Sequence, residues 1–214
     1  MKTLKIEIVH DLVCSWCPIG YANLQTALNN LNIKADMYFL PSELNPAMGA
    51  EGEAIDTHLA QRYGWSEAKR RDYRTHLLAV AQVAGVNMDF SKRTHYYNTH
   101  LGHKIMHLCE GHNKQQTMNE LFINAYFKLG LDISNTQVLL ELAAQVGLDR
   151  AETEKALTSK EVNHAMSLKQ KRVKQLGLGS VPAFIFNESM LVSGSNSVEY
   201  FEQVLVALTE KETA

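Results

Sequence analysis

Patterns typical of β-strands occur only at the two ends of this 214-residue chain, and helical patterns fill the long stretch between them. Residues 5–10 and 33–40 near the start, and residues 183–186 and 190–192 near the end, are rich in alternating, β-branched or aromatic side chains. From about residue 52 to 176 apolar residues recur at helical spacing, and no strand is predicted there. The four end segments are therefore expected to form one sheet, which a helical insertion interrupts.

The same patterns predict where the helices lie. The first follows the first strand over about residues 15–31, with Pro18 in its first turn, where a missing N–H costs no hydrogen bond. Further runs are predicted near 66–84, 101–111, 115–129, 135–146, 150–157 and 160–176, and a last helix follows Ser197. We therefore predict an α/β fold. Residues 1–46 and 159–214 build a mixed four-stranded sheet domain, and residues 47–158 build an inserted all-helical domain.

Charge and hydropathy argue against two classes of partner. The formal net charge is −2 and the lysines and arginines are scattered, so we expect no nucleic-acid partner. No apolar run approaches the roughly 20 residues that cross a bilayer, so we expect no membrane partner. The first residues lack the features of a secretion signal, which favours a cytoplasmic location. In a reducing compartment a close cysteine pair is more often catalytic or metal-binding than structural.

Cys14 and Cys17 form such a pair at the start of the first predicted helix. Free N–H groups and the positive end of the helix dipole lower the pKa of a thiol there, so we expect Cys14 to be an exposed nucleophile. Cys17 lies one helical turn further on, where a more buried thiol can attack a mixed disulfide on Cys14. The alternative is half of a zinc site. Only Cys109 and scattered histidines remain as further ligands, so no metal is predicted.

Other residues have both a functional and a structural interpretation. Trp16 can shield a disulfide and contact a substrate, or it can simply pack. His100, His103 and His107 share one helical face and can bind a metal or supply a proton, whereas surface or interdomain packing is the ordinary explanation. Cys109 is expected to be a buried helix residue, with a regulatory thiol as the alternative.

A second element lies near the end of the chain, where Pro182 directly precedes a predicted strand. Its spacing alone predicts a trans bond to Val181, since cis X-Pro bonds are uncommon. Taken with the cysteine pair, however, this element makes the chain resemble the DsbA-like thioredoxin-fold family, specifically its FrnE-type branch. The matching motifs are Asp11-x-x-Cys14-x-Trp16-Cys17-x-Ile19-Gly20 and Gly177-x-Gly179-Ser180-Val181-Pro182-Ala183-Phe184.

The resemblance implies a thioredoxin fold with an inserted helical domain. It also implies that Cys14 is the nucleophile, that Cys17 is the resolving cysteine, and that Pro182 is a cis-proline facing the pair. The residue before that proline, Val181, then offers backbone groups to the substrate. His103 matches the pattern of the branch and is expected to contact the active-site cleft. Ser15 stands where the branch commonly has proline, which leaves the preferred direction of the reaction open.

Three functions follow as hypotheses. The first is a dithiol oxidoreductase or isomerase acting on disulfides of proteins or small molecules, without a cofactor and with glutathione able to serve as reductant. The second comes from the related 2-hydroxychromene-2-carboxylate isomerases and kappa-class glutathione transferases, which use glutathione and typically carry serine at the nucleophile position. The third is a non-catalytic peptide-binding module. Both thiols are present here, which favours disulfide exchange.

Overall fold

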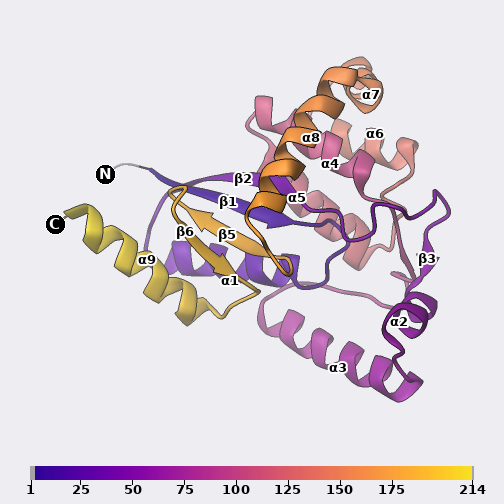
Figure 1. Ribbon diagram of the computed structural model, residues 1–214, viewed down its shortest axis with the longest axis horizontal. Coiled ribbons are helices and arrows are strands. Elements are labelled where there is room, and N and C mark those ends of the chain that lie inside the picture. The colour runs from indigo at the N-terminus through magenta and orange to yellow at the C-terminus, as the bar shows by residue number, and fades with distance from the viewer. Residues whose placement is uncertain (1–2, 214) are drawn as a thin grey trace.

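The computed structural model describes residues 3–213 and contains a central sheet of four strands. The strands are β1 (Leu4–His10), β2 (Ala35–Pro41), β5 (Ala183–Phe186) and β6 (Met190–Ser193), in the order β2-β1-β5-β6. β1 runs parallel to β2 and antiparallel to β5, and β5 pairs antiparallel with β6. The sheet is mixed and unites the two ends of the chain, as the sequence predicts (Figure 1).

Helices cover both faces of this sheet, because β1 and β5 carry apolar side chains on both sides. α1 (Cys17–Asn30) and α9 (Val198–Thr213) lie together on one face (Figure 1), where Ile6 and Phe184 belong to the main hydrophobic cluster. α8 (Lys160–Gln175) covers the other face, where Val9 and Ile185 form a smaller cluster. The strands thus present alternate residues to two different helical layers.

We call residues 47–158, the predicted insertion, the helical block. This block packs into the same core as the sheet. It contains α2 (Ile55–Tyr63), α3 (Glu67–Val83), α4 (His100–Gly111), α5 (Gln115–Ile123), the π-helical turn η1 (Asn124–Lys128), α6 (Thr136–Gln145) and α7 (Arg150–Thr158). Ile105 of α4 and Phe122 of α5 share one continuous hydrophobic cluster with Ile8 of β1 and Phe39 of β2. The block is therefore anchored to the sheet by shared packing.

Two short strands interrupt the helical block, so the prediction of an unbroken helical stretch is wrong. β3 (Glu53–Ala54) and β4 (His95–Tyr96) pair antiparallel, and each is two residues long. Such a ladder is too short to show a period of two, and its pairing joins segments about 40 residues apart, which no local pattern reveals. The helix α2 that directly follows β3 also lies outside the predicted runs.

The other helices lie close to their predicted positions. The side chain of Asn135 caps α6 by accepting from the N–H groups of Gln137 and Val138, and the Ser197 hydroxyl accepts from the N–H of Tyr200 at the start of α9. The predicted helix over 115–129 is divided between α5 and η1. Among residues 3–213, every helix is too short or too polar to span a bilayer.

Candidate active site

The segment from Asp11 to Cys17 turns the chain from β1 into α1 and carries the cysteine pair. The N–H of Cys14 donates to the Asp11 carbonyl at 3.1 Å, and the N–H of Cys17 donates to the Cys14 carbonyl at 3.3 Å. Cys17 is the first residue of α1, two residues later than predicted, and Pro18 follows in the first turn, where an N–H has no intrahelical acceptor. Cys14 therefore lies in a turn just before the helix, and Cys17 lies inside it.

The two thiols are free and have opposite pKa shifts. The pKa of Cys14 is lowered, mainly because the Cys17 thiol donates a hydrogen bond to its sulfur, with help from the N–H groups of Trp16 and Cys17 and against the effect of burial. The pKa of Cys17 is raised, mainly because burial disfavours a thiolate there. Cys14 is consequently the thiol that ionises first.

The expectation that Cys14 is exposed is wrong, because the residue is 6% accessible to solvent and Cys17 is 5% accessible. The Cys14 thiol donates to the carbonyl of Val181 at 3.6 Å. Burial raises the pKa values of Tyr73 and Tyr96 of the helical block, and a charge on Cys14 adds to this effect. Sequence reasoning missed the burial of Cys14 because it involves residues far along the chain, such as Val181 at 167 positions away. Cys14 and Cys17 are buried outside the hydrophobic clusters of the described residues, whereas Cys109 belongs to the main cluster.

Val181 and Pro182 lie beside the cysteine pair and are joined by a cis peptide bond. The trans bond predicted from spacing is thus wrong, and the cis bond implied by the family resemblance is confirmed. The carbonyl of Pro182 accepts from the N–H of Gly194 at 2.8 Å. Gly20 of α1 makes the packing possible, because a Cβ there would lie 3.1 Å from Pro182, Phe184 and the Cα of Ser195.

A buried acid–imidazole pair connects this site to the helical block. His103 of α4 has its Nε2 3.3 Å from Oδ1 of Asp11, and the side chains are 1% and 0% exposed. The other carboxylate oxygen of Asp11 accepts from the N–H of Leu44 at 2.6 Å. The His10 ring packs edge-on against His103 with centroids 5.3 Å apart. His103 is therefore turned toward Asp11 and shielded from solvent.

The remaining residues that the sequence singled out have separate environments. His100 contacts Glu43 at 2.9 Å, and His107 lies 3.7 Å from Glu110, so the three histidines of α4 face three different carboxylates. Cys109 is buried, as predicted, and burial raises the pKa of its thiol to about 12. Burial thus makes Cys109 an inert thiol at neutral pH.

Trp16 caps the start of α1 and packs toward α3. Its ring centroid lies 6.1 Å from that of His76, and it borders the cluster formed by Ile19, Leu77 and Ala81. The half-buried indole therefore connects the cysteine turn to the helical block. Its predicted contact with a substrate stays a prediction.

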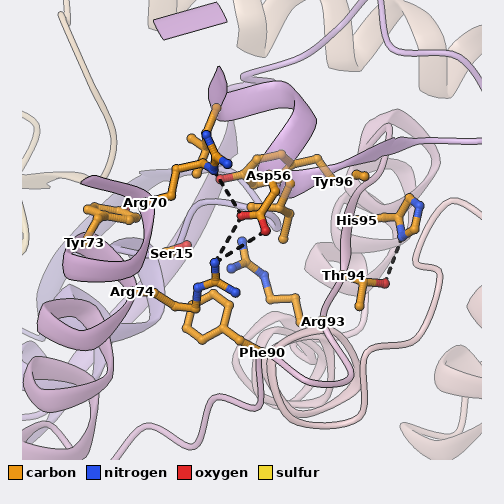
Figure 2. Close-up of a pocket in the computed structure, with 13 residues that line it drawn as sticks. Ser15, Asp56, Arg70, Tyr73, Arg74, Phe90, Arg93, Thr94, His95 and Tyr96 are labelled. Atoms are coloured by element: carbon orange, nitrogen blue, oxygen red, sulfur yellow. Dashed lines mark hydrogen bonds and ion pairs between the residues drawn. The ribbon is translucent and has the colours of Figure 1, made fainter. Parts of the chain in front are cut away.

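A pocket of about 240 Å³ opens next to Ser15, the residue after Cys14 (Figure 2). The helical block supplies its other walls, which include Ile55, Leu59, Tyr73, Phe90 and Tyr96 together with Asp56, Arg70, Arg74 and Arg93. Sequence reasoning missed this pocket. The arginines lie on α3 and on the loop before β4, and nothing in their spacing indicates that they share a cavity with the cysteine turn.

Known proteins are similar to this chain in sequence or in fold. YwbO of Bacillus subtilis is 23% identical over 204 residues, which cover 95% of this chain and 96% of YwbO. A probable DsbA oxidoreductase from Streptomyces coelicolor superposes with a TM-score of 0.88 at 24% identity, over 95% of this chain and 89% of that chain.

More distant structures have the same architecture. The cytosolic disulfide reductase DsbM from Pseudomonas aeruginosa, solved with GSH, has a TM-score of 0.67 at 17% identity, over 98% of each chain. A 2-hydroxychromene-2-carboxylate isomerase has a TM-score of 0.65 at 13% identity, also over 98% of each chain. These likenesses show a thioredoxin fold with a helical insertion. Residues 5–206 also match the family model described as the DSBA-like thioredoxin domain, so the chain belongs to that family.

Proposed function

We propose that this protein is a thiol–disulfide oxidoreductase that works through Cys14 and Cys17. The observation that carries the proposal is the opposite pKa shift of two thiols within one turn of chain, lowered at Cys14 and raised at Cys17. Because of this difference, Cys14 is a thiolate under conditions in which Cys17 keeps its proton. Disulfide exchange needs this division between an attacking thiolate and a second thiol held in reserve.

The reaction proceeds in two exchanges. The Cys14 thiolate attacks one sulfur of a substrate disulfide, which forms a mixed disulfide and releases the other substrate sulfur as a thiolate. Cys17 then loses its proton and attacks the Cys14 sulfur, which releases the second substrate thiolate and leaves a Cys14–Cys17 disulfide. Run in reverse, the same steps oxidise a substrate dithiol.

The neighbours of Cys14 have supporting roles in this scheme. The Val181 carbonyl already faces the Cys14 sulfur, so it can accept from the backbone of a substrate chain once that thiol has reacted. Trp16 lies in the cysteine turn and Pro182 lies beside it, so both shape the surface that the substrate meets. His103 contacts Asp11 and is shielded from solvent, so its proposed effect on the substrate is indirect: it holds the cysteine turn in place.

The substrate class is a disulfide of a protein or a small molecule, and glutathione is the proposed reductant. The structure of DsbM with GSH supports glutathione as a partner, since that protein shares this fold. That relative is also described as cytosolic, in agreement with the cytoplasmic location proposed for this chain. No cofactor is required, because the electrons are carried by sulfur alone.

Substitution of each cysteine tests this function. Cys14→Ser is expected to lower insulin reduction to the rate of the added reductant alone, whereas Cys17→Ser is expected to accumulate a mixed disulfide that mass spectrometry detects. Cys109→Ala is the matched control, because it removes a thiol outside the pair. Full insulin reduction by Cys14→Ser would refute the proposal. Saturable glutathione binding by calorimetry without disulfide exchange would favour the isomerase alternative.

A further inference from the structure

The pocket beside Ser15 has a cationic floor and apolar walls. Three arginine side chains and one carboxylate, Asp56, line it, so its fixed charge is positive. Arg74 lies 3.1 Å and Arg70 3.6 Å from the Asp56 carboxylate, which therefore neutralises part of that charge. In Figure 2 the guanidinium groups of Arg70, Arg74 and Arg93 are directed toward the centre of the pocket, around Asp56.

Arg93 differs from Arg70 and Arg74 because it makes no ion pair with Asp56. It is 2% exposed, and within residues 3–210 no carboxylate lies within ion-pair distance of it. One of its terminal nitrogens donates to the Val13 carbonyl at 3.1 Å, and its Nε has no hydrogen-bond partner. Four aromatic rings surround the guanidinium at 4.8–5.4 Å, namely Phe90, Tyr96, Tyr126 and Phe127.

The rings stabilise this cation in part, but they leave its charge and one donor without an anionic partner. A buried, unpaired donor costs free energy comparable to a lost hydrogen bond, and the cost is larger when the group is charged. A carboxylate placed in the pocket would meet the guanidinium groups of both Arg93 and Arg74. Arginine is well suited to bind a carboxylate in this way, because its planar fork offers parallel N–H donors.

The pocket is also connected to the reactive sulfur. Ser15, which follows Cys14, forms part of the pocket wall, and Val13, which precedes Cys14, accepts the hydrogen bond of Arg93. Tyr73 and Tyr96 line the pocket and also lie near Cys14. A molecule held by its acidic group in the pocket therefore has its remaining atoms close to the cysteine turn.

From these contacts we propose that the pocket binds the carboxylate of a small acidic disulfide or thiol, with Arg93 and Arg74 as the anion-binding residues. The proposal rests on the proposed exchange function and names the substrate class of the same site. A pocket of about 240 Å³ holds part of a small molecule and not a folded protein segment. The Cys14 thiolate attacks a substrate disulfide R–S–S–R, which gives Cys14–S–S–R and releases R–S⁻. Cys17 then expels the second R–S⁻.

Three aliphatic disulfides that differ in charge test this selectivity. Oxidation of the reduced protein by 3,3′-dithiodipropionate, neutral 2-hydroxyethyl disulfide and cationic cystamine is followed by stopped-flow tryptophan fluorescence, and each rate is divided by that of dithiothreitol with the same disulfide. The wild type is expected to prefer dithiodipropionate over the neutral disulfide by about tenfold or more, the effect of one hydrogen bond to a charged group.

Arg93→Gln and Arg74→Gln are each expected to lower this preference by about tenfold. Arg71→Gln is the matched control, because Arg71 lies on the same helix α3, is well exposed and does not line the pocket. Its selectivity is expected to equal that of the wild type. If Arg93→Gln does not fold, as judged by circular dichroism, the more exposed Arg74→Gln decides the test.

Equal normalised rates for all three disulfides in the wild type would overturn the anion site and leave the exchange function intact. An unchanged preference in Arg74→Gln would likewise overturn the assignment of that arginine. Absence of reaction with every disulfide would instead refute the exchange function itself, so the two failures are distinguishable.

Discussion

At Cys14 two opposing effects set the pKa of the thiol. Burial favours the neutral thiol, while the hydrogen bond from the Cys17 thiol and the nearby N–H groups favour the thiolate. Hydrogen bonding has the larger effect, so the pKa falls. The resolving cysteine is thus also the main reason that the nucleophile is ionised, and the two roles of Cys17 can be separated by substitution.

Removing the Cys17 donor is expected to raise the pKa of Cys14. In Cys17→Ala no thiol donates to the Cys14 sulfur, the charged form loses its main stabilisation, and the midpoint of the alkylation profile moves to higher pH. Cys17→Ser keeps a hydroxyl donor, so its midpoint is expected to stay closer to that of the wild type. Both midpoints are measured by labelling Cys14 with iodoacetamide across pH 5–10 and following the product by mass spectrometry. This range includes the ordinary thiol pKa of about 8.5. Coincident profiles for the two variants would contradict this account.

The residues of the site differ in how far sequence alone could predict them. Cys14 and Cys17 stand out by their spacing, whereas the cis bond at Pro182 and the role of Val181 follow only from the family resemblance. Neither spacing nor the resemblance indicates Arg93, because its hydrogen bond to Val13 joins residues 80 positions apart, and arginines on α3 and a loop share no local pattern. The burial of Cys14 likewise involves residues far along the chain, since Val181 contacts its sulfur from 167 positions away.

Among the elements, α1 packs closely against Pro182 and the strand β5 that follows it. Gly20 lies at this contact, and a Cβ there would be 3.1 Å from a proline ring, an aromatic ring and a main-chain Cα. Two of these neighbours belong to the turn and strand that follow Val181, where the chain cannot shift without moving the carbonyl beside Cys14. The position of α1 against this segment therefore sets the geometry of the cysteine pair.

Gly20→Ala is expected to destabilise the fold by about 1 kcal/mol, because overpacking outweighs the gain in helix propensity. It is also expected to slow insulin reduction, since Pro182 must give way near Cys14. Gly111→Ala at the end of α4 is the control: a Cβ there meets nothing within 4 Å, so no loss of stability is expected. Urea denaturation measures both, and a Gly20→Ala protein as stable as the wild type would show that the contact has room to relax.

The elements also show where periodicity stops being informative. Periodicity predicts long helices such as α3 and α8 well, because many turns repeat one apolar face. The two-residue strands β3 and β4 have no repeat, and α1 begins two residues later than predicted because no capping side chain marks its start. Boundaries set by tertiary contacts are thus the part that sequence leaves open.

On the scale of the whole molecule, one hydrophobic cluster joins the sheet to the helical block. Phe122 of α5 is buried in this cluster together with Ile8 of β1 and Phe39 of β2. Separating the two parts would expose apolar surface on both, so the described chain is expected to unfold as one unit.

Phe122→Ala is expected to destabilise the protein by about 3–5 kcal/mol, the usual cost of removing a buried phenylalanine. Since the cluster is shared, both parts are expected to lose stability together. In a Trp65→Phe background Trp16 reports on the contact between the cysteine turn and α3, and in a Trp16→Phe background Trp65 reports on the interior of the helical block. Urea denaturation of both backgrounds therefore follows the two signals separately. Val83→Ala, at a position 91% exposed, serves as the control and is expected to change stability little. Separate transitions for the two tryptophans would show independent units.

The pairing of β1 with β5 has a consequence for synthesis. Val181 follows Cys14 by 167 residues, so at ribosomal rates it is made on the order of ten seconds later. During that interval the nascent chain has neither the strand that completes its sheet nor the carbonyl that faces the first sulfur. The cysteine turn is thus made early, whereas the carbonyl and the strand that complete its surroundings are made late, so the site is assembled only after residue 186 has been added.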